Sequence, residues 1–198
     1  QTLMYDNENF LENKQEFSPK EIIKVNTKYT VDELIRRSLN YSDNFADELI
    51  WNHLKILGGD YDLVAEIYRD LGIVNSYNLN STSIGVKGYN SIFRLLYNSS
   101  FLNKDNSEKL LKILSQNTFE EGLRSGIPKD IKLANKFGER VLSSGEKQLH
   151  DCGIVYYPTN PYSLCVMTKG KDLKDLEKII SHISTEVYKE FDSRKLEK

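Results

Sequence analysis

A change of hydrophobic period near position 132 constrains the fold of this chain more than any other feature. Before it, apolar residues recur every three to four positions, as on one face of an amphipathic helix. After it, three segments are strand-like, namely Leu133 to Phe137, Gln148 to Tyr157 and Tyr162 to Thr168, and short turn sequences separate them. A helical stripe from Leu173 to Tyr188 follows. The pattern predicts three antiparallel strands with a long helix on one face, and therefore an α+β fold.

Start and stop signals divide the helical part into short helices. Thr30 and Glu33 form a capping box, and the apolar stripe behind it predicts a helix that ends near Tyr41. Two short extended pieces are expected before this helix, at 2–5 and 21–25. Further helices are expected from Phe45 to Gly58, from Asp60 to Gly72, from Gly88 to Tyr97, from a cap at Asn106-Ser107 to Leu114, and from Phe119 to Arg124. A loop is expected at 75–83.

Composition bounds the class of protein. The chain has 198 residues, 39% of them hydrophobic, which suffices for one domain over 1–198, with a helical lobe at about 30–126 and the sheet and last helix at about 130–192. The chain has 27 basic and 29 acidic residues, and the basic residues form no cluster along the sequence. Nucleic-acid binding is therefore not expected. No apolar run reaches the roughly 18 to 20 residues that a membrane span needs, and we expect none.

The cysteines and histidines do not suggest a metal site. Cys152 and Cys165 fall in neighbouring predicted strands, and we expect buried free thiols. His53, His150 and His182 are widely spaced and lack the pairing of a zinc-binding helix, so no metal and no cofactor are expected. We expect His150 to be a strand residue paired with a neighbour.

Two short motifs carry the functional hypothesis. Ser42-Asp43-Asn44 lies at a predicted helix-to-helix junction, where such residues also serve simply to cap free backbone groups. Lys136-Phe137-Gly138 places a fixed cation beside a glycine that lets a ligand approach the backbone. A Ser-Asp-Asn box followed by a later Lys-x-Gly strand is the order found in penicillin-recognising serine enzymes.

The likeness extends beyond these two boxes and covers nearly all of the chain. The chain resembles the class A β-lactamase-related serine hydrolases, relatives of the D-Ala-D-Ala peptidases. The segments that carry the resemblance are Tyr29 to Ile35 running into Tyr41 to Asn44, Ala134 to Glu139, Leu149 to Tyr156, and Tyr162 to Gly170.

The resemblance implies a β-lactamase-like fold with an active site between a helical lobe and a sheet. Ser42 would relay a proton to the leaving group and Lys136 would supply positive potential, as the catalytic pair. Asn44 would hold the substrate amide, and Phe137, Gly138 and Glu139 would line the substrate strand. The Glu139 backbone N–H would donate to the oxyanion. The substrate would be a peptidoglycan peptide or a β-lactam, and the location would be outside the bacterial cytoplasm, at the envelope or secreted.

The nucleophile of that family is not found where the resemblance requires it. A Ser-x-x-Lys motif should open a helix upstream of Tyr29, but the only such spacing is Ser144 to Lys147, in a predicted hairpin turn. We therefore expect that the N-terminal portion of the domain is missing, and that this portion is a partner for the chain. The chain alone is predicted to be inactive, with an unpaired sheet edge that favours association.

Two further departures bear on the substrate. No acidic residue lies between Asp70 and Asp105, where a glutamate would activate the deacylating water, so fast deacylation is not expected. Phe137 replaces the threonine or serine whose hydroxyl would bind the substrate carboxylate, and Arg140 is a candidate replacement. These departures favour an alternative: an inactive scaffold that keeps the fold and binds peptidoglycan or a partner protein.

Overall fold

The computed structural model describes residues 1–4, 15–19, 21–57, 66–67, 69–71 and 84–196. The chain forms two compact units, Gln1–Ser83 and Ile84–Lys198, and each is described by itself. The helix expected from Asp60 to Gly72 falls largely outside the described residues, and the loop expected at 75–83 falls wholly outside them. The single domain over 1–198 stays a prediction.

In the first unit, the described residues include a two-stranded sheet and the helices α1 (Val31–Tyr41) and α2 (Asn44–Ile56). Strand β1 (Thr2–Met4) pairs antiparallel with β2 (Lys28–Thr30), and the helices α1 and α2 follow. The predicted cap of α1 is confirmed, because the Thr30 side chain accepts a hydrogen bond from the Glu33 backbone N–H at 3.2 Å. The extended piece expected at 21–25 is not a strand. Its place is taken by β2, which continues directly into α1.

Apolar side chains from both helices and the lead segment make the core of this unit. The buried members are Ile23, Tyr29, Leu34, Ala46 and Leu49. Ile23 and Tyr29 bring the segment before α1 into the core, so burial anchors it both at Ile23, which is not in a strand, and at Tyr29 of β2.

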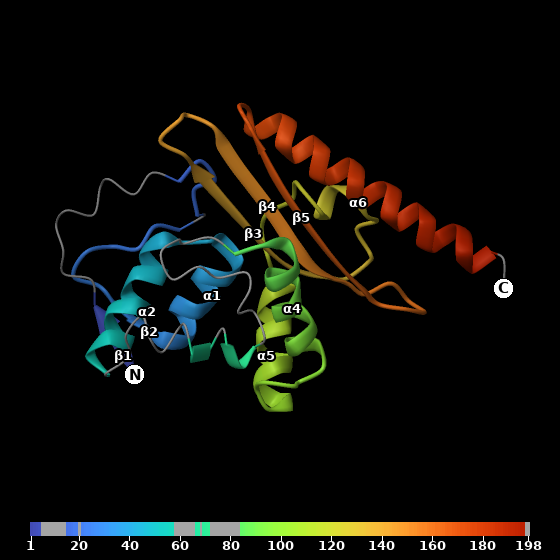
Figure 1. The fold of residues 1–198 in the computed structure, drawn as a ribbon. Helices are drawn as coiled ribbons and strands as arrows, with labels where there is room; N and C mark the ends of the chain where they lie inside the picture. The colour runs from blue at the N-terminus through green and yellow to red at the C-terminus, as the bar shows by residue number, and fades with distance from the viewer. Residues whose placement is uncertain (5–14, 20, 58–65, 68, 72–83, 197–198) are drawn as a thin grey trace. The chain divides into compact units, whose positions relative to one another are not determined.

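The second unit contains the predicted three-stranded sheet. Strands β3 (Leu133–Val141), β4 (Lys147–Val155) and β5 (Tyr162–Gly170) pair antiparallel in the order β3-β4-β5 (Figure 1). The α+β fold with an antiparallel sheet and a C-terminal helix is thereby confirmed. Two strands run further than the apolar pattern indicated, because polar residues at strand ends still pair through their backbones.

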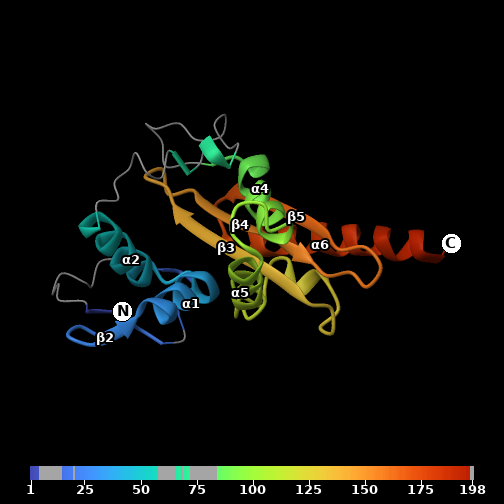
Figure 2. The ribbon, with the colours of Figure 1, turned by 90° about the horizontal axis from the view of Figure 1, so that it is seen from below.

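Helices lie on both faces of this sheet. Tyr162 of β5 stacks on Phe191 of α6 (Leu173–Leu196), while the next residue, Ser163, accepts a hydrogen bond from Asn90 of α4 (Val86–Tyr97). Since adjacent strand residues point to opposite faces, α6 and α4 cover opposite sides of the sheet, as Figures 1 and 2 show. Helix α5 (Lys104–Leu114) packs on α4 and β3.

Two predicted helix boundaries are wrong for local reasons. Helix α5 begins three residues early, because Asn103, and not Asn106, is its N-cap and accepts from the Asn106 backbone N–H at 2.9 Å. The helix expected from Phe119 to Arg124 does not form. Gly122 has φ +60°, in the left-handed region, which ends any right-handed helix there. Only the short 3₁₀ helix η2 (Arg124–Gly126) follows.

The expectation of free thiols is also wrong. Cys152 of β4 lies directly opposite Cys165 of β5, and the two form a disulfide bond. The strands were correctly paired from the sequence, but bonding of the two sulfurs depends on the register, which the sequence did not settle.

No helix within the described part of the chain is long and apolar enough to cross a membrane.

Candidate functional site

The Ser-Asp-Asn box forms the turn between α1 and α2. Ser42 ends α1 in the left-handed conformation, at φ 52° and ψ 37°, and the backbone N–H of Asp43 reaches back to the Arg37 carbonyl at 3.4 Å. Asp43 is the N-cap of α2: its carboxylate accepts from the backbone N–H groups of Phe45 and Ala46 at 3.0 and 3.3 Å. Asp43 thus fills a structural role, and Ser42 and Asn44 flank it, both half-buried.

A glutamine from the lead segment brackets this turn. The Gln15 side-chain amide donates to the Ser42 carbonyl at 2.6 Å, and its oxygen accepts from the Asn44 backbone N–H at 3.2 Å. One side chain therefore holds the backbone on both sides of Asp43. Nothing in the sequence around Gln15 signals this role, because a glutamine in a polar lead has no distinctive spacing.

The charge of the buried cap is set by its surroundings. Asp43 is fully buried, and burial raises the pKa of its carboxyl above the ordinary value, while the two backbone donors and Arg37 oppose this shift. Arg37 is itself buried and pairs with Glu21 and Glu33, both at 3.1 Å. This network ties α1 to the lead segment and fixes the start of the turn.

The Lys-x-Gly box lies on β3, an edge strand of the described sheet. Lys136 is half-buried, and its ammonium donates to the Phe137 carbonyl at 2.6 Å and lies 5.0 Å from the Phe137 ring centre. Gly138 leaves its side open, since a Cβ placed there meets no atom within 4 Å. The cation beside accessible backbone that the sequence indicated is therefore present on this strand.

Phe137 points to the opposite face and belongs to the core. It is 3% exposed and stacks on Phe119, with ring centres 4.3 Å apart. Its side chain is enclosed in the core, and its carbonyl accepts from the Lys136 ammonium. Glu139 is half-buried and Arg140 is exposed at the far end of the same strand.

A buried carboxyl group on the neighbouring strand, that of Asp151, binds the side chain of a β3 residue. Asp151, opposite Phe137 in β4, accepts from the Asn135 side-chain amide at 2.8 Å and from the Leu123 backbone N–H at 2.9 Å. Burial raises the pKa of Asp151 to about 7, and these hydrogen bonds oppose the rise. The pair fixes the residue that precedes Lys136. Sequence reasoning missed it, since the partners lie on different strands.

The face of the sheet that carries Lys136 is built in rows of directly opposed residues. Lys136 lies opposite Cys152, which is bonded to Cys165, and Gly138 lies opposite His150. Burial lowers the pKa of His150. Among the described residues its buried Nδ1 has no hydrogen-bond partner, so the pairing with a neighbour that the sequence suggested is not found at this atom.

The structure brings some of the predicted residues together on one strand. Lys136, Phe137, Gly138 and Glu139 are consecutive in β3, whereas Ser42 and Asn44 belong to the first unit. The Ser-x-x-Lys spacing at 144–147 lies at the turn between β3 and β4, as predicted, with Ser144 exposed and bonded to Glu146. Within the described part of the chain, no three His, Cys, Asp or Glu side chains gather as metal ligands do.

Comparisons with known proteins agree on one family. The sequence model described as "Beta-lactamase enzyme family" matches residues 1–191. A curated β-lactamase of Bacillus licheniformis is 31% identical over 182 residues, which cover 83% of this chain and 57% of that protein. The chain thus spans little more than half the length of this relative.

Solved structures share the fold at lower identity. The structure of PBP-A superposes with a TM-score of 0.76 at 20% identity and covers 98% of this chain and 72% of its own. The TLA-3 extended-spectrum β-lactamase gives a TM-score of 0.77 at 20% identity, over 96% of this chain and 74% of that one. A β-lactamase from Chitinophaga pinensis gives a TM-score of 0.72 at 20% identity, and the match covers 93% of this chain and 73% of that one.

Proposed function

The chain belongs to the beta-lactamase enzyme family, and we propose that it forms part of a serine acyl-transfer hydrolase acting on peptidoglycan-type amides or β-lactams. In this proposal the nucleophile comes from a segment outside the 198 residues. The observation that carries the proposal is Lys136, a half-buried cation beside the open side of Gly138 on an edge strand.

The residues of β3 are assigned to substrate binding. A β-strand edge offers backbone groups that pair with an extended peptide, and Gly138 removes the side chain that would block its approach. The backbone N–H of Glu139 is the proposed donor to the oxyanion, and the Phe137 backbone belongs to the same binding strand. Lys136 stabilises negative charge on the substrate carboxylate or the tetrahedral intermediate.

The turn residues of the first unit are assigned to proton transfer and positioning. Ser42 carries a hydroxyl, which donates and accepts at once and so can pass a proton to a leaving group. Asn44 offers an amide that both donates to and accepts from a substrate amide. The clamp by Gln15 and the cap by Asp43 support this assignment, because they hold the backbone of both residues in place.

We place the protein outside the cytoplasm. The Cys152–Cys165 disulfide supports this, since such bonds persist mainly in oxidising compartments.

Fluorescent-penicillin labelling of the full-length protein tests the proposal. We expect a covalent adduct, with the labelling rate lowered about 100-fold in Ser42→Ala and in Lys136→Ala, because each removes a group that acts in the transition state. Lys112→Ala, which removes an exposed lysine of α5, is the matched control and should label normally. Absence of any adduct together with absence of esterase activity would contradict the enzymatic proposal.

A second candidate function is a non-catalytic scaffold that binds peptidoglycan or a partner protein. The enclosed Phe137 ring favours it, because the hydroxyl that would read a substrate carboxylate is absent at that position. The upstream sequence of the gene separates the two candidates. A Ser-x-x-Lys motif that opens a helix supports the hydrolase, and its absence supports the scaffold.

A further inference from the structure

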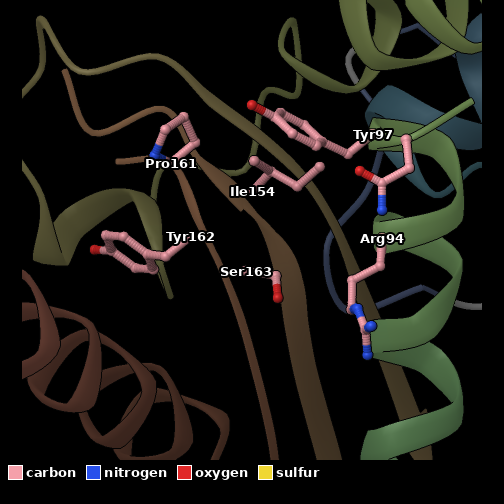
Figure 3. Close-up of a pocket in the computed structure, with 7 residues that line it drawn as sticks. Arg94, Tyr97, Ile154, Pro161, Tyr162 and Ser163 are labelled. Carbon is pink, nitrogen blue, oxygen red and sulfur yellow. The ribbon is translucent and has the colours of Figure 1, made fainter. Parts of the chain in front are cut away.

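A separate pocket lies between α4 and the ends of β4 and β5. It has a volume of about 180 Å³ and is lined by seven residues of the second unit (Figure 3). Arg94, Tyr97 and Asn98 are spaced at i, i+3 and i+4, which places them on one side of α4. Figure 3 shows Arg94 and Tyr97 on the side of α4 that faces the strands carrying Ile154 and Ser163.

Apolar groups form the inner part of the pocket. Ile154 is 3% exposed, and Pro161 continues this surface, while the Tyr162 ring points to the other face of the sheet and stacks on Phe191. Tyr97 forms an aromatic wall of the pocket, and its ring contacts the Tyr156 ring, with ring centres 6.2 Å apart. A flat apolar ring would contact carbon atoms on several sides here, so the pocket suits an aromatic or other flat apolar body.

Polar groups converge at the mouth and carry positive charge. Arg94 is exposed and presents a guanidinium, the group best matched to a carboxylate. The Ser163 hydroxyl accepts from the Asn90 amide at 3.1 Å and keeps its own hydrogen for donation.

We propose that this pocket binds a small aromatic carboxylate. The carboxylate lies against Arg94 and the Ser163 hydroxyl, and the ring lies on Ile154, Pro161 and Tyr97. Size supports a ligand of one ring, because a closed apolar cavity of about 150 Å³ is known to accept benzene. The lining of the pocket does not include Lys136 or Gly138: Ile154 and Ser163 form one row of the sheet face, Lys136 lies in the next row with Cys152 and Cys165, and Gly138 lies in the row after that.

Titration of the isotopically labelled chain with three probes tests this site by NMR. Benzoate should produce saturable shifts at the amides of Ile154 and Ser163. Benzamide, which keeps the ring but lacks the charge, and acetate, which keeps the charge but lacks the ring, should each bind about fivefold more weakly or worse. Equal affinity for benzoate and benzamide would overturn the assignment of Arg94, and the absence of saturable benzoate binding would overturn the site.

Two variants of α4 give a matched comparison. Arg94→Gln should weaken benzoate about fivefold and leave benzamide unchanged, because it removes only the partner of the carboxylate. Lys87→Gln removes the same charge from an exposed position of the same helix outside the pocket, and should change neither. Benzoate affinity that falls equally in both variants would show general electrostatic attraction and contradict the proposal. Penicillin labelling should be normal in Arg94→Gln, so a failure here is distinct from a failure of the proposed function.

Tyr97→Ala provides an independent check of the aromatic wall. It should weaken benzoate and benzamide alike, since both use the ring contact, while circular dichroism confirms that the exposed substitution leaves the fold intact. Unchanged binding of both probes would contradict the proposed placement of the ring.

Discussion

At the scale of single residues, Asp151 makes stability depend on pH in an unusual direction. Its pKa rises from 3.8 to about 7 on folding, so between these values the folded protein holds a proton that the unfolded chain has released. The folded state then binds more protons, and the free energy of unfolding falls as pH rises through this window. Above about pH 7 the contribution is flat, because both states are ionised.

Asp151→Asn tests this: the amide does not titrate and should abolish that part of the pH dependence, while the loss of one of the two accepting oxygens lowers stability by the same amount at every pH. Urea unfolding followed by circular dichroism, across pH 4 to 7, measures the difference between the parent chain and the variant. Glu146 and Glu186 have lowered pKa values and act in the opposite direction, but they are common to both proteins and cancel in this difference. Parallel curves would show that Asp151 is ionised in the folded protein throughout.

Single-residue roles were predictable where the signal is local. Thr30 was recognised as a cap because its partner lies three residues away. Lys136 and Gly138 were recognised as a cation beside open backbone because they are near neighbours in one strand. The partners of Asp151 are 16 and 28 residues distant, and no local pattern encodes their approach.

At the scale of elements, the disulfide joins β4 and β5 at directly opposed positions. It closes a loop with a sequence separation of 13, and restricts the unfolded chain accordingly. The double substitution Cys152→Ala and Cys165→Ala should lower the free energy of unfolding by about 2 to 3 kcal/mol. Urea unfolding with and without reductant measures this.

The double variant also supplies the control for that experiment. Reductant should destabilise the parent chain by a similar amount and leave the double variant unaffected. Detection of two free thiols in the untreated, oxidised protein would contradict the bond.

Helices and strands were predicted correctly where the hydrophobic periodicity and the turn sequences indicate the same element. The switch to strand-like sequence near position 132 correctly gave three antiparallel strands and the covering helix. Predicted helix boundaries were wrong where polar residues or a glycine, and not the apolar pattern, determine where a helix begins or ends. The first turn of α5 is outside the apolar stripe, so Asn103 was overlooked as a cap, and Gly122 adopts a conformation that a helical stripe does not reveal.

At the scale of the whole molecule, the outer strands of the sheet matter for association. Within the described residues, β3 and β5 each have β4 as their one strand partner. A strand that has a partner strand on one side can pair with a second chain on its other side. The 198-residue chain on its own should therefore associate as its concentration rises.

Light scattering over a concentration series measures this association. A version extended at its N-terminus to the length of the family's members is the control and should remain monomeric, if the added residues pair with an edge. A clean monomer of the short chain at every concentration would contradict the prediction. The pocket beside α4 could not be foreseen at this scale, because it depends on how a helix lies on strand ends far along the chain.

At Ser42, the left-handed backbone conformation means that the residue best for stability differs from the residue needed for the proposed proton relay. A residue with a Cβ is strained at φ 52°, whereas glycine adopts this conformation without steric strain, and the clamp by Gln15 uses the backbone carbonyl of Ser42. Selection for heat resistance alone would therefore favour Ser42→Gly, which should raise the melting temperature. Selection for proton relay would reject the same change. The persistence of serine among natural variants would then report which demand prevails.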